Sequence, residues 1–65
     1  MNNNIKTLRS EKGIMQKDLA IKVGVSSPYL HDLENGARGA KPETLEKIAA
    51  ALDVTVDELI RKEGA

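Results

Sequence analysis

The segment Gln16–Asn35, QKDLAIKVGVSSPYLHDLEN, decides the fold of this chain. Apolar residues at helical spacing on both sides of Gly24 predict two short helices joined by a tight turn. Gly24 stands where the chain leaves the first of these helices, a position that favours positive φ. Ser26 is a strong N-cap residue for the helix that follows. The segment therefore predicts two consecutive helices that cross and pack against each other.

Two crossed helices joined by a glycine turn form the helix-turn-helix motif, whose second helix can enter the major groove of DNA. The motif alone is only moderately specific, because any tight turn between two helices can imitate it. It gives DNA binding as the first hypothesis for this chain.

The rest of the sequence predicts three more helices and no strand. The first helix of the chain carries Ile5 and Leu8 and stops at Gly13. After the two helices of the motif, Pro42 opens a fourth helix, and Thr55 with Glu58 has the capping-box spacing that begins a short fifth one. We therefore expect an all-α bundle of about five short helices. Its expected core is Ile5, Leu8, Leu19, Ala20, Val23, Val25, Leu30, Leu33, Leu45, Ile48, Ala49, Leu52, Val54, Val56 and Leu59.

Two positions depart from this apolar pattern. Met15 falls at the N-cap position of the second helix, where its side chain cannot accept a backbone hydrogen bond; a missing cap typically costs about 1 kcal/mol. Ile21 lies off the apolar stripe of the same helix, so we expect it to be exposed.

Length and composition exclude several classes of protein. Sixty-five residues predict one domain, 1–65, with helix-turn-helix motif 16–35 and fraying ends at 1–3 and 62–65, and no separate effector domain. There is no Cys and only one His, so we expect no disulfide, metal site or cofactor. No membrane span, small-molecule site or set of catalytic residues is recognisable. We expect a cytoplasmic protein that is not an enzyme.

Charge is unevenly distributed along the chain although the net charge is zero. Residues 1–24 carry five basic and two acidic side chains, whereas residues 25–65 carry five basic and eight acidic ones. A basic surface toward DNA and an acidic surface away from it would suit DNA binding. Chance separation of charged surface residues explains the uneven distribution equally well.

The chain resembles the Cro/cI-type (phage repressor, or XRE) helix-turn-helix domains over residues 5–60. The residues that carry the resemblance are Ile5-Lys6-x-Leu8-Arg9, Gly13, Gln16-x-x-Leu19-Ala20-x-x-Val23-Gly24-Val25-Ser26, Leu30-x-x-Leu33-Glu34-Asn35-Gly36 and Glu43-Thr44-Leu45-x-x-Ile48-Ala49-x-Ala51-Leu52-x-Val54. The resemblance implies a lambda-repressor-like DNA-binding fold.

It also implies roles for individual residues. Gln16 and Asn35 should contact the phosphate backbone, the exposed start of the third helix should face base edges, and the loop that follows should meet phosphate. Arg9 and Glu34 match a pair that often forms a partly buried salt bridge between the first and third helices. The expected DNA-binding residues are Gln16, Lys17, Ser26, Ser27, Pro28, Tyr29, Asp32, Asn35, Arg38 and Lys41.

Several of these residues are also explained by a structural or solvent-exposed role that does not involve DNA. Ser26 is favoured as a cap, Tyr29 is equally suited to half-buried packing, and Asp32 suits a solvated charge better than a base contact. Lys17 is equally suited to a phosphate contact or a solvated face. The base-reading positions also lack the Gln and Arg side chains that make bidentate base contacts, so specificity is expected to be modest or to depend on DNA shape.

Two hypotheses about function remain. In the first, the chain is a sequence-specific, repressor-like transcriptional regulator of double-stranded DNA that forms a homodimer through Val56, Leu59 and Ile60 of the last helix. In the second, it is a protein-interaction or antitoxin-like module on the same fold, which the neutral net charge favours.

Overall fold

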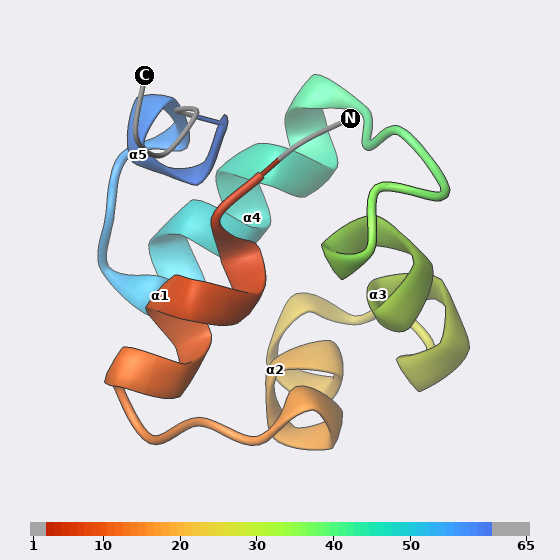
Figure 1. Cartoon of the computed structure of the whole chain (residues 1–65), viewed down its shortest axis with the longest axis horizontal. Coiled ribbons are helices and arrows are strands. Elements are labelled where there is room, and N and C mark those ends of the chain that lie inside the picture. Colours follow the sequence, from red (N-terminus) through yellow and green to blue (C-terminus); the bar gives the residue numbers. More distant parts are fainter. Residues whose placement is uncertain (1–2, 61–65) are drawn as a thin grey trace.

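The computed structural model describes residues 3–60, and these residues form five helices and no strand. The helices are α1 (Ile5–Glu11), α2 (Gln16–Val23), α3 (Ser27–Glu34), α4 (Pro42–Leu52) and α5 (Val56–Ile60). Helix α2 packs against α3 and α4, and α1 packs against α2, α4 and α5 (Figure 1). The prediction of an all-α bundle of five short helices is confirmed.

Local signals explain where the helices of the motif begin and end. Gly24 ends α2 at φ +85°, in the left-handed region that only glycine enters without cost. The backbone N–H groups of Gly24 and Val25 both donate to the carbonyl oxygen of Ala20, at 2.8 and 3.0 Å, and close the turn. Ala20 is 2% exposed, and its small side chain helps α2 pack closely.

The core consists of aliphatic side chains contributed by all five helices. Among residues 3–60, eleven are buried: Ile5, Leu19, Ala20, Val23, Leu30, Leu33, Leu45, Ile48, Ala49, Leu52 and Leu59. The other four residues expected in the core, Leu8, Val25, Val54 and Val56, are partly buried and pack against it. Ile21 is 77% exposed, as expected.

The structure decides between two expectations for Leu59. The sequence placed this residue both in the core and in a dimer contact; its side chain is 0% exposed, so the core prediction is confirmed and the side chain is not available to a dimer contact. A five-residue helix can bury a core residue only by turning one face inward, and Leu59 occupies that face. Ile60 remains 43% exposed, and Val56 is partly buried.

The start of the described chain is tied to two distant helices. The side-chain amide of Asn3 donates to the carbonyl oxygen of Leu33 at 2.7 Å, and its side-chain oxygen accepts from the backbone N–H of Ile5 at 3.1 Å. The backbone N–H of Asn4 donates to the carbonyl oxygen of Leu59 at 2.7 Å. Asn3 was grouped with a fraying end, but it is held by the end of α3. Residues 1–2 and 62–65 of those ends lie outside the described residues.

Candidate nucleic-acid interface

Helix α3 begins with an exposed turn held by a side-chain cap. The Ser26 hydroxyl oxygen accepts a hydrogen bond from the backbone N–H of Tyr29 at 3.2 Å, which makes Ser26 the N-cap. Ser27 and Pro28 follow it and are exposed, whereas Leu30 is fully buried. The apolar face therefore anchors the helix, and the start of its other face is open to solvent.

A buried carboxylate fixes the other end of α3. The Nε atom of Arg9 donates to Oε2 of Glu34 at 2.7 Å, and its Nη2 atom donates to Oε1 at 3.1 Å. The side chain of Glu34 is 2% exposed and that of Arg9 is 12% exposed. This bidentate geometry is the strongest kind of ion pair between side chains. The structural salt bridge expected between α1 and α3 is present.

The same ion pair also holds the start of α2. The Nη1 atom of Arg9 donates to the backbone carbonyl oxygen of Ile14 at 2.8 Å, in the loop between α1 and α2. The side-chain nitrogen of Gln16 donates to Oε1 of Glu34 at 3.0 Å. Gln16, expected to bond phosphate, thus has its amide oriented within the protein. Sequence reasoning missed this bond because Gln16 and Glu34 are 18 positions apart and no local pattern links them.

A second cluster joins the loop after α3 to the exposed face of that helix. The Nη2 atom of Arg38 lies 3.8 Å from Oδ2 of Asp32, and the Cζ atom of Arg38 lies 5.3 Å from the centre of the Tyr29 ring. Tyr29 is partly buried and packs against the core. The structure brings these three expected DNA-binding residues together, which the sequence did not predict.

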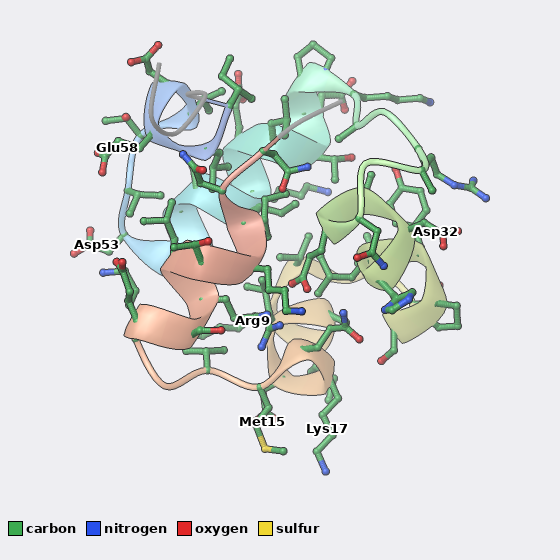
Figure 2. The ribbon with its side chains drawn as sticks, viewed as in Figure 1. Arg9, Met15, Lys17, Asp32, Asp53 and Glu58 are labelled. Atoms are coloured by element: carbon green, nitrogen blue, oxygen red, sulfur yellow. The ribbon has the colours of Figure 1, made fainter. Side chains whose placement is uncertain are left out.

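The remaining expected residues lie around these two clusters. The side-chain nitrogen of Asn35 lies 2.9 Å from Nε2 of His31, one helical turn earlier. Lys17 is exposed on α2 and points away from the body of the domain beside Met15 (Figure 2). Lys41 is exposed at the N-cap position of α4. Within residues 3–60, no hydrogen bond or ion pair joins these side chains to Tyr29, Asp32 or Arg38.

Two acidic side chains that come after α3 in the sequence, those of Asp53 and Glu58, lie away from that helix. Asp53 follows α4 and Glu58 belongs to α5, and both lie on the opposite side of the molecule from Asp32 and Lys17 (Figure 2). The Glu58 carboxylate accepts from the backbone N–H of Thr55 at 3.2 Å in the expected capping box. These carboxylates would therefore not face a ligand bound to α3.

None of the helices within residues 3–60 has the length and apolar character of a membrane span.

Comparison with known proteins places this arrangement among DNA-binding regulators. A family model described as helix-turn-helix matches residues 5–59. The HTH-type transcriptional regulator DdrOP3 of Deinococcus deserti is 39% identical over 56 residues, which cover 86% of this chain and 43% of that protein. The control protein C.MunI of a Mycoplasma species is 38% identical over 58 residues, 88% of this chain and 78% of that protein. This chain thus spans less than half the length of DdrOP3.

A solved structure with the same fold contains DNA. The crystal structure of SinR, the master regulator for biofilm formation, in complex with DNA matches with a TM-score of 0.75 and 42% identity. The match covers 80% of this chain and 84% of that one.

Proposed function

The chain belongs to the helix-turn-helix family of DNA-binding transcriptional regulators, and from that premise we propose how it acts: α3 enters the major groove of duplex DNA and reads its sequence. The observation that carries this proposal is the exposed start of α3, held at both ends by Ser26 and by the buried Arg9–Glu34 pair. A rigid helix can present Ser27 and Pro28 to base edges without ordering them on binding. Repressor-like action and a cytoplasmic location are parts of the same proposal.

Phosphate contacts would fix the position of α3 on DNA. The Gln16 side-chain nitrogen carries two hydrogens, and Glu34 takes one of them, so the other can be donated to a phosphate oxygen. The start of α2 adds the favourable partial charge of a helix N-terminus. We propose that Gln16, Lys17, Asn35 and Lys41 contact the backbone and carry no sequence information.

We further propose that two copies bind one operator. The domain measures 31 × 23 × 18 Å. Its longest dimension is close to the length of one turn of DNA, about 34 Å. One copy therefore covers about one half-site, and two copies would double the contact. Ile60 is the candidate contact on α5, with Val56 beside it at the edge of the core.

DNA titration at several salt concentrations tests the proposal. Affinity for labelled duplex DNA should fall linearly with salt on a logarithmic scale, in proportion to the number of phosphates contacted. Ser27→Ala should change the preferred sequence, whereas Gln16→Ala should weaken binding to all sequences by a similar factor. Both variants should keep the wild-type circular dichroism, because Ser27 is exposed and Glu34 retains both bonds from Arg9.

Two results would contradict the proposal. Absence of binding at low salt would favour the alternative, a protein-interaction or antitoxin-like module on this fold. Equal and uniform losses from Ser27→Ala and Gln16→Ala would remove the distinction between base-reading and phosphate-binding residues.

A further inference from the structure

The face that α3 offers to DNA has no Lys or Arg of its own. The sequence of the helix, SPYLHDLE, contains neither Lys nor Arg, and its one full charge on the exposed face is the carboxylate of Asp32. A lone carboxylate in the groove would be repelled by phosphate. The structure places a guanidinium from the following loop, that of Arg38, against this face.

Three observations describe how Arg38 is held. Its Nη2 atom lies 3.8 Å from the Asp32 carboxylate, which compensates the negative charge on α3. Its Cζ atom lies 5.3 Å from the centre of the Tyr29 ring, within the distance of a cation–π contact. The side chain still has 57% of its surface exposed, so donors of its planar fork remain accessible. These contacts place the guanidinium beside the exposed face of α3 without burying it.

We propose that Arg38 is a specificity-determining residue that reads a guanine in the major groove, with Tyr29 and Asp32 as its positioning residues. A guanidinium can donate two hydrogen bonds to O6 and N7 of guanine, which is the commonest specific contact between a side chain and a base. This inference rests on the proposed function and differs from the sequence-based expectation that Arg38 only meets phosphate. It gives the interface the bidentate base contact that α3 itself lacks.

Selection from a random pool of duplex DNA separates the two roles of Arg38. The wild type should enrich a motif with a guanine at one position of each half-site. Arg38→Lys keeps the charge but loses the fork, so its preference for that guanine should fall about tenfold or more while the salt dependence stays the same. Lys41→Ala is the matched control, because it should weaken all sequences alike and lower the salt dependence.

Variants of the two positioning residues have their own readouts. Asp32→Asn should lower the discrimination for guanine on duplexes made from the selected motif. If Asp32 were only a repulsive charge, its removal would instead raise affinity for every sequence equally. Tyr29→Phe should keep the guanine preference, because the ring face remains, and Tyr29→Leu should reduce it.

The outcomes distinguish this inference from the proposed function. If the wild type binds no duplex DNA, the proposed function fails and the inference with it. If the wild type selects a motif and Arg38→Lys selects the same motif with the same base preferences, Arg38 is a phosphate contact. That result overturns the inference and leaves the proposed function standing.

Discussion

Met15 has the backbone conformation of an N-cap residue but not a side chain that can cap the helix. It precedes α2 with φ −76° and ψ 152°, the extended conformation of an N-cap residue, but its side chain makes no cap hydrogen bond. The side chain is also 59% exposed, so it contributes little to the core. The sequence-based prediction of an uncapped helix at this position is confirmed.

Replacing Met15 by Ser should stabilise the domain. The hydroxyl would accept a hydrogen bond from an N–H in the first turn of α2, which is worth about 1 kcal/mol. For a domain of this size, that gain corresponds to an increase in Tm of about 4–8 °C. Thermal unfolding followed by circular dichroism measures the change. Met15→Ala is the control, since it removes the apolar side chain without adding a cap; an equal gain in both variants would contradict the capping explanation.

Glu34 makes one contact that the sequence predicted and one that it did not. Its pairing with Arg9 was expected from the resemblance, and the structure contains it. Its bond to Gln16 was not expected, and it changes the reading of Gln16 from a free surface amide to an oriented one. A hydrogen bond between two side chains depends on where the helices cross, which no local pattern records.

At the scale of elements, α4 ends with an unusual residue. Asp53 has φ 58° and ψ 45°, and it alone among the non-glycine residues of the described chain has positive φ. This conformation lets the backbone N–H groups of Asp53 and Val54 donate to the carbonyl oxygens of Ala50 and Ala49, at 3.2 and 2.9 Å. Asp tolerates the left-handed region better than most residues, but its negative charge opposes the helix dipole at this end.

The effect of substituting Asp53 on stability should therefore depend on whether the new residue tolerates positive φ. Asp53→Gly removes the cost of positive φ and the charge, and we expect a gain of about 0.5–1 kcal/mol in the free energy of unfolding. Asp53→Ala removes the charge but keeps a Cβ atom in the left-handed region, so we expect a loss. Urea denaturation measures both. Equal stabilities of the two variants would show that the backbone conformation at this position carries no cost.

Helix α5 depends on its neighbours for its stability. Five residues are too few for an isolated helix. The capping box from Thr55 to Glu58 and the hydrogen bonds from Asn4 to the carbonyl oxygens of Glu58 and Leu59 hold it in place. Sequence spacing predicted the capping box, but the contribution of Asn4 required the fold to bring this residue next to α5.

At the scale of the whole molecule, α3 and α5 lie on opposite sides of the bundle (Figure 1). A contact between two copies through α5 would therefore leave α3 of each copy uncovered. Helices α1 and α4 pack against α5 and against each other, and α2 packs against both of them and against α3, so the two surfaces belong to one packed body. The positions of both surfaces are consequently set by the same core.

The proposed dimer predicts a change in mass with concentration. Sedimentation should show association of the wild type as its concentration rises, and Ile60→Asp should weaken it by placing a charge in the contact. Ile21→Asp is the matched control, because Ile21 is also exposed but lies on α2. A protein that stays monomeric at every concentration, both free and bound to duplex DNA, would exclude the dimer.

The sequence by itself determined the helices, their ends and the family. Apolar spacing, Gly24, Ser26, Pro42 and the Thr55–Glu58 pair are local signals, and local signals act on the backbone within one or two turns. The fold class predicted from them is confirmed, and so is the family that the resemblance indicated.

Only the tertiary structure decided which polar side chains meet. It tied Asn3 to α3, turned Gln16 toward Glu34 and placed Arg38 over Tyr29. Each of these contacts joins residues from different elements, and its existence depends on the angle and distance between those elements. Hydrophobic burial is set by composition and period, whereas a directional contact needs two side chains at one point in space.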